Sequence, residues 1–106
     1  MPWVYLIIAG LFEVVWALAM KQSEGFTRPG PTVVTLVAMA VSFALLSLSM
    51  KALPLGTAYT IWTGIGAVGA FLVGIAVLGE PAGGMRILAA LLIVAGLVLM
   101  KLSSPA

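Results

Sequence analysis

The stretch TAYTIWTGIGAVGAFLVGIAVL, residues 57–78, contains no charged side chain. A membrane-spanning helix needs about 20 mostly apolar residues, within a range of roughly 17 to 25. The stretch has that length, and it lacks the alternation of apolar and polar residues that is typical of strands in a transmembrane barrel. The sequence therefore predicts that residues 57–78 cross a bilayer as a helix.

The same stretch contains the pattern G-x-G-x-x-G at Gly64, Gly66 and Gly69. In dinucleotide-binding enzymes this pattern follows a strand, opens a helix and precedes an acidic residue by about 20 positions. Here the glycines lie in the middle of an apolar span, and Glu80 comes too early, so a nucleotide site is excluded. Small residues let neighbouring helices approach closely in lipid, whereas glycine pairs can also bend a helix. Both interpretations stay open.

Three further apolar stretches have similar lengths, and helix-breaking residues separate them. The chain is 63% hydrophobic and only 8% charged, whereas a soluble domain carries about a quarter charged residues. These features predict an all-α membrane protein in which residues 1–106 form a single four-helix transmembrane domain. The expected helices cover about residues 3–20, 32–50, 57–78 and 85–102.

The first stretch could instead be a signal peptide, because Ala17-Leu18-Ala19 resembles a cleavage site. A signal peptide would begin with basic residues, and none precedes Trp3. Its apolar region would also not contain a carboxylate such as Glu13. A mature first helix is therefore favoured.

Composition also limits the possible functions. The net charge of +2 is small and scattered, which argues against a nucleic-acid partner. The chain has no Cys and no His, so disulfides and the usual transition-metal sites are excluded, and we expect no cofactor. With only three carboxylates, a hydrolase that uses a carboxylate pair is hard to build, so an enzyme is not expected.

Glu13 lies inside the first apolar stretch. A charge at the middle of a bilayer costs about 2.5 to 3.5 kcal/mol on insertion scales, so its presence needs a reason. No Lys or Arg lies within the apolar stretches to pair with it; Arg86 and Lys101 stand only at the two ends of the fourth. Helical spacing places Trp16 on the same face, together with the small residues Ala9, Gly10 and Ala17. The sequence predicts a functional carboxylate that faces a small chamber.

Several polar and aromatic residues of the other spans can complete that chamber. Trp16 can donate its indole N–H to the Glu13 carboxylate or present its face to a cation, although a lone Trp is also typical of the membrane interface. Ser42 is one of few polar residues in the second span, and a lone Ser there often bonds its own backbone. The third span places Tyr59 and Trp62 on one stripe.

Four segments carry a resemblance to a known family. They are FEVVWA at 12–17, EGFTR at 24–28, KALPLGTAY at 51–59 and WTGIGAVG at 62–69. Along nearly its full length the chain resembles the small multidrug resistance family, and within it the guanidinium-exporter subtype. It departs from the family's pattern at Thr60 and in the connection at 79–85, neither of which is at the expected site.

The resemblance implies an antiparallel, dual-topology homodimer in the inner (plasma) membrane that exchanges protons for guanidinium and small substituted guanidines. It implies that Glu13 of both subunits holds the proton or the cation. It also implies that the surrounding wall binds the substrate, with Trp16, Ser42, Tyr59 and Trp62 as its members. Two alternatives are a broad quaternary-ammonium or multidrug exporter and a non-transporting small membrane subunit.

The basic residues are consistent with insertion in both orientations. The side of a membrane protein with more Lys and Arg stays in the cytoplasm. The expected helices place three basic residues on one side (Lys21, Arg28 and Arg86) and two on the other (Lys51 and Lys101). A difference of one should not fix the orientation. Small residues at Ala89 and Gly96 in the fourth span could form a seam between two copies.

Overall fold

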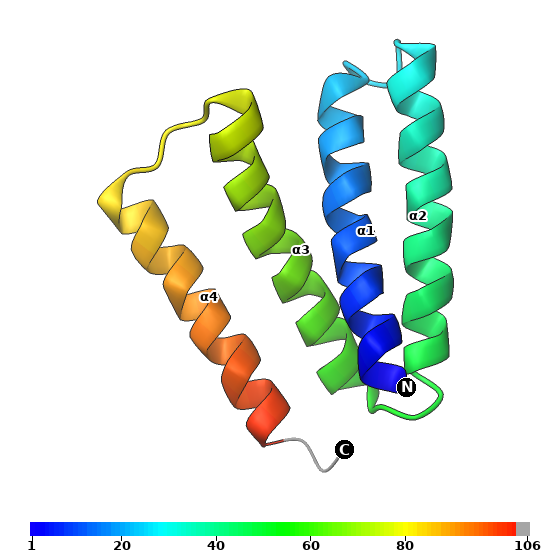
Figure 1. Ribbon diagram of the computed structural model, residues 1–106, viewed down its shortest axis with the longest axis vertical. Coiled ribbons are helices and arrows are strands. Elements are labelled where there is room, and N and C mark those ends of the chain that lie inside the picture. The colour runs from blue at the N-terminus through cyan, green and yellow to red at the C-terminus, as the bar shows by residue number, and fades with distance from the viewer. Residues whose placement is uncertain (104–106) are drawn as a thin grey trace.

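The computed structural model describes residues 1–103, and these form four helices (Figure 1). Each helix is long and apolar enough to cross a membrane. The prediction of four long apolar helices is therefore confirmed. Residues 104–106 of the expected domain lie outside the described part of the chain. The helices are α1 (Pro2–Gln22), α2 (Pro29–Ser49), α3 (Leu55–Leu78) and α4 (Gly84–Leu102).

The first connection is shorter than the sequence suggested. We expected residues 21–31 to be irregular, but α1 continues to Gln22 and α2 begins at Pro29. Proline is tolerated in the first turn of a helix, because the N–H that it lacks would have no partner there. The hydroxyl of Ser23 caps the turn: it donates to the carbonyl of Met20 at 2.7 Å and accepts the backbone N–H of Phe26 at 3.0 Å.

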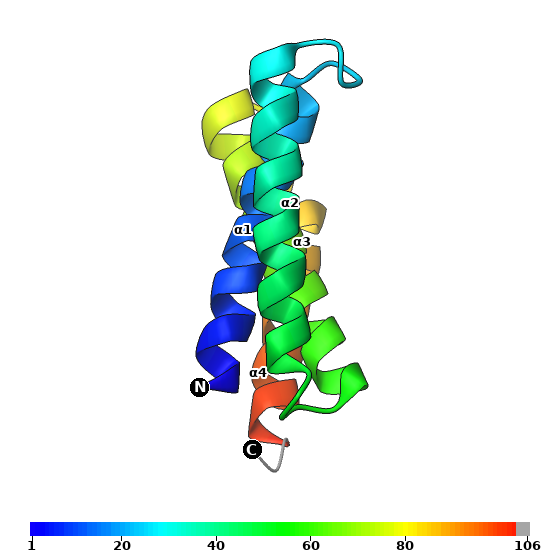
Figure 2. The same cartoon turned by 90° about the vertical axis from the view of Figure 1, so that its right-hand side faces the viewer.

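The helices run alternately up and down, in the spatial order α4, α3, α1, α2 (Figure 1). Helix α1 packs against both α2 and α3. Among the described helices, the backbone of α4 comes close only to that of α3. The principal dimensions are 43 × 34 × 16 Å, so the helices form a thin slab (Figure 2). A helix with its side chains is about 10 to 12 Å across. The slab is therefore too thin for one copy to surround an aqueous path.

The buried core lies where α1, α2 and α3 meet. It consists of Leu6, Ala9, Leu46, Leu53, Ala58, Ile61 and Trp62. Helix α4 has no buried residue in the described structure, and most of its large apolar side chains are exposed. In a membrane protein such a face contacts either lipid or another protein chain.

The glycines of α3 lie at close helix contacts. A Cβ atom at Gly66 or Gly69 would overlap side chains of α1, and a Cβ at Gly64 would overlap Leu97 of α4. On α1, a Cβ at Gly10 would overlap Ile65 of α3. Helix α3 runs unbroken through Gly64, Gly66 and Gly69. The packing interpretation thus accounts for their positions.

Apart from Glu13, the charged residues lie at the two ends of the slab, as the expected topology requires. The α1–α2 and α3–α4 connections share one end, and the α2–α3 connection shares the other end with the N-terminus (Figure 1). Near one end, the guanidinium of Arg86 lies 5.6 Å from the centre of the Phe71 ring. Near the other, the ammonium of Lys101 lies 4.2 Å from the centre of the Trp3 ring. These long side chains pack on aromatic rings close to the expected membrane surfaces.

Candidate functional site

Glu13 lies in the middle of α1, half-buried against α3. Its carboxylate occupies the space in front of Gly66, where a Cβ atom would overlap it. Any other L-residue at position 66 would thus compete with the carboxylate for that space. The fold therefore places Gly66, from the G-x-G-x-x-G pattern, directly against Glu13, the carboxylate of the first span.

The carboxylate has unused hydrogen-bonding capacity. Its Oε1 atom is buried and has no hydrogen-bond partner among residues 1–103. The indole Nε1 of Trp16 is also buried without a partner there. Of the two roles considered for Trp16, the hydrogen bond to Glu13 is therefore not formed within these residues. The Trp16 ring instead lies edge-to-face with Phe43 of α2, with ring centres 6.3 Å apart.

Ser42 connects three helices through its hydroxyl. The hydroxyl donates to the carbonyl of Ala9 on α1 at 2.7 Å and accepts the indole N–H of Trp62 on α3 at 3.0 Å. Ser42 is fully buried and Trp62 nearly so. Ser42 thus bonds to the backbone of α1 and not to that of its own helix. This network fixes the orientation of the Trp62 ring.

Four aromatic side chains form a continuous row across α3, α2 and α1. The ring of Tyr59 lies 5.5 Å from that of Trp62, and Trp62 lies 5.8 Å from Phe43. Phe43 then contacts Trp16. Phe43 was missed as a site residue, although it directly follows Ser42 and is aromatic. Its role becomes visible only when α2 is docked, because the row needs a ring between the two tryptophans.

The hydrogen-bond network and the carboxylate are close neighbours. Ala9 precedes Glu13 by four residues on α1, and Trp62 precedes Gly66 by four on α3. Residues four apart lie about one helical turn apart on the same face. The carboxylate therefore lies about one turn from the Ser42 network on both helices. The structure brings together all five predicted site residues: Glu13, Trp16, Ser42, Tyr59 and Trp62.

This arrangement is suited to a small cation. An unpaired carboxylate within a membrane-spanning helix attracts positive charge, and aromatic faces stabilise cations through their quadrupoles. A planar guanidinium can donate two parallel hydrogen bonds to a carboxylate and stack on an aromatic ring. The site therefore has the two elements that such an ion needs, a hydrogen-bond acceptor and flat apolar walls.

Comparison with known proteins agrees with this chemistry. Residues 1–93 match the family model described as Small Multidrug Resistance protein. A protein of Salmonella typhimurium named guanidinium exporter is 57% identical over 98% of this chain and 99% of its own length. Proteins of the same name from Escherichia coli K12 and Klebsiella oxytoca are each 56% identical with the same coverage.

Proposed function

The chain belongs to the small multidrug resistance family of membrane proteins, and from this we propose that it is an antiporter that exports guanidinium in exchange for protons. The observation that carries the proposal is Glu13, a carboxylate inside a membrane-spanning helix whose Oε1 atom is buried without a partner in the described structure. Relatives that are 56–57% identical over nearly the whole chain are named guanidinium exporters. These names support transport as the function that we propose.

The proposed substrates are guanidinium and small substituted guanidines. Guanidinium is planar and delocalised, so it matches both the carboxylate and the aromatic row. We assign Glu13 the charge-pairing role and assign Trp16, Tyr59 and Trp62 to the walls of the site. Ser42 belongs to the same wall: it holds Trp62 in place, and one lone pair of its hydroxyl is left for the substrate.

Coupling follows from competition at one carboxylate. Ionised Glu13 attracts the cation, whereas protonated Glu13 carries no charge and does not. A site that releases the cation when it takes up a proton exchanges the two across the membrane, provided that it opens to one side at a time. No second acidic residue lies in a membrane-spanning helix of this chain, so both ions use Glu13.

We propose that the working unit is a homodimer with its copies inserted in opposite orientations in the inner (plasma) membrane. A slab 16 Å thick cannot enclose an aqueous path by itself. The described residues of α4 are all at least partly exposed, which leaves a face for a second copy, and Ala89 and Gly96 offer a seam of small residues on it. The antiparallel arrangement supplies the inverted symmetry on which many transporters rely.

Flux in liposomes tests the proposal directly. Purified protein is reconstituted with guanidinium on one side, and movement of guanidinium and of protons is recorded together. The proposal expects guanidinium to drive protons in the opposite direction. Proton movement driven equally well by large quaternary ammonium ions would favour the broad multidrug exporter, and absence of any flux would favour a non-transporting subunit.

A further inference from the structure

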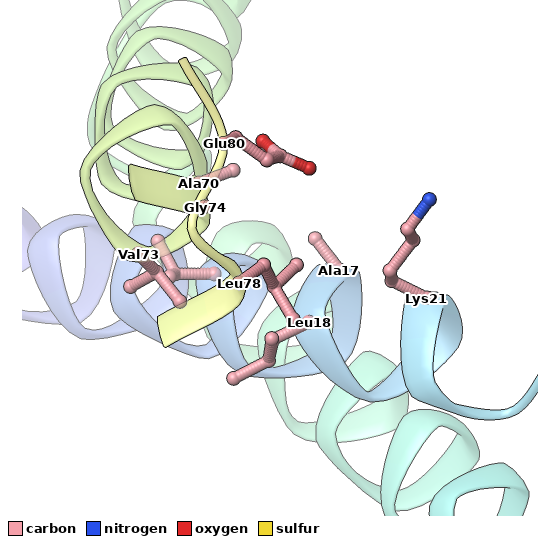
Figure 3. A pocket seen from close by; sticks show the side chains of 9 residues that line it. Ala17, Leu18, Lys21, Ala70, Val73, Gly74, Leu78 and Glu80 are labelled. Carbon is pink, nitrogen blue, oxygen red and sulfur yellow. The ribbon is translucent and has the colours of Figure 1, made fainter. Parts of the chain in front are cut away.

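A cavity lies between α1 and α3, at the end of the slab that carries the α3–α4 connection (Figure 3). Its volume is about 180 Å³. Apolar side chains form most of its wall, including Val14 and Ala17 of α1. Two charged residues line it as well, Lys21 near the end of α1 and Glu80 just beyond α3. It therefore has an apolar interior with one side chain of each charge.

The backbone directs Glu80 into this cavity. Helix α3 ends at Leu78, and Gly79 adopts a left-handed conformation with φ of 69°. This conformation reverses the chain, and the backbone N–H of Glu80 donates to the carbonyl of Gly74 at 3.0 Å. A Cβ atom at Gly74 would overlap the Glu80 carboxylate. Two glycines thus position this carboxylate against the last turns of α3.

The Glu80 carboxylate has no cationic partner within residues 1–103. Lys21 lines the same cavity, but the two side chains form no ion pair, and Figure 3 shows their charged ends apart. The carboxylate is therefore available to an incoming cation. The Lys21 ammonium nearby weakens that attraction, which keeps any bound cation exchangeable.

The cavity continues the α1–α3 seam that holds Glu13. Val14 lies against Gly69 and also lines the cavity, and Ala17 follows Glu13 by one helical turn. From Glu13 to Lys21 the helix rises roughly 12 Å, at 1.5 Å per residue. The cavity therefore lies within about two helical turns of Glu13 along α1.

We propose that Glu80 is an outer docking site for guanidinium-type cations, on their route between the aqueous phase and Glu13. The site deepens the proposed transport function and rests on it. Because Glu80 is exposed, its affinity is low, and its effect is on the rate of encounter. A single charge acting over about 4 to 8 Å of water changes the local concentration of a cation roughly two- to fivefold.

Initial rates of guanidinium flux in liposomes test this site, at limiting guanidinium and low ionic strength. Glu80→Gln should lower the rate about two- to fivefold, and Lys21→Gln should raise it. The rate at saturating guanidinium should not change. Glu24→Gln is the matched control, because it removes the same charge from the other connection at this end of the slab. At about 1 M salt the Debye length is near 3 Å, so the differences should vanish.

Gly74→Ala tests the geometry without a change of charge. The added methyl group would displace the Glu80 carboxylate, so this variant should have the same initial rate as Glu80→Gln. Gly56→Ala places a methyl group in open space on the same helix and should keep the wild-type rate. Equal rates for Glu80→Gln and Glu24→Gln, with active wild-type protein, would overturn the outer site alone. A wild-type protein that moves no guanidinium would overturn the proposed function and this site together.

Discussion

The indole N–H of Trp62 donates to the hydroxyl of Ser42 at 3.0 Å, and that hydroxyl donates in turn to the carbonyl of Ala9. Three helices therefore share one hydroxyl group, about one turn from Glu13 on α1. Every member of the network is buried. The orientation of the Trp62 ring in the proposed binding wall thus depends on a residue of another helix.

Replacing Ser42 with Ala should both loosen the fold and weaken binding. The buried N–H of Trp62 would lose its partner, which costs about 1 to 3 kcal/mol of stability. Guanidinium affinity should fall by about 0.5 to 1.5 kcal/mol, the value of one ordinary hydrogen bond. Calorimetric titration and thermal unfolding of the purified protein measure the two effects. Ser47→Ala, at an exposed position of the same helix, should change neither; equal effects of the two variants would contradict the role of the network.

Gly66→Ala should impair transport through the position of the Glu13 carboxylate. The new methyl group would occupy the space that the carboxylate fills, so either the side chain or the helices must move. Alanine favours the helix more than glycine by about 1 kcal/mol, so loss of helix is not the expected cause. Guanidinium flux should fall at least tenfold, an order-of-magnitude expectation for a misplaced binding group. Gly56→Ala, which meets open space, is the control and should retain full flux.

The four helices followed from the sequence, and Glu13 stood out as a candidate site residue, because membrane physics leaves few options. Long apolar stretches must be helices, and a carboxylate inside one of them needs a function. The contact between Glu13 and Gly66 did not follow, because it depends on how α1 and α3 pack. The same holds for Phe43, which joins the aromatic row only through the docking of α2. The helix boundaries were predicted least accurately: α2 begins at Pro29 and α3 at Leu55, whereas residues 32 and 57 were expected.

Orientation in the membrane should be mixed. The difference of one basic residue between the two ends is too small to fix insertion. Because the chain has no cysteine, Ser103→Cys provides a single labelling site near one end. Impermeant thiol reagents applied to intact cells should label about half of the protein, and permeabilisation should expose the remainder. Labelling that is complete or absent in intact cells would contradict the antiparallel dimer.

Selectivity should favour small planar cations. Trp62 is held by Ser42 and lies between the rings of Tyr59 and Phe43, so the wall cannot easily make room for bulk. Guanidinium and singly substituted guanidines should be transported, and large polyaromatic cations poorly. Competition of each cation with guanidinium flux in liposomes provides the measurement. If tetraphenylphosphonium moved as fast as guanidinium, the aromatic row would not be the selective element.

Coupling should depend on Glu13 alone among the acidic residues. Glu13→Gln keeps the shape of the side chain but offers a cation no charge and cannot exchange a proton. Guanidinium-driven proton movement should therefore be abolished. The protein should still fold, because removing an uncompensated buried charge relieves its desolvation cost. Glu24→Gln, in the exposed connection between α1 and α2, should leave the exchange stoichiometry unchanged.

The pH dependence of binding distinguishes competition from simple charge pairing at a distance. Guanidinium affinity of the wild type should weaken as the pH falls, because a protonated Glu13 no longer attracts the cation. Glu13→Asp should stay partly active with this dependence shifted towards acid, since Asp is intrinsically the stronger acid by about 0.4 pH units. Glu13→Gln should bind weakly at every pH, because no proton can compete there. Affinity of the wild type that is constant between acid and neutral pH would mean that protons and guanidinium do not share this carboxylate.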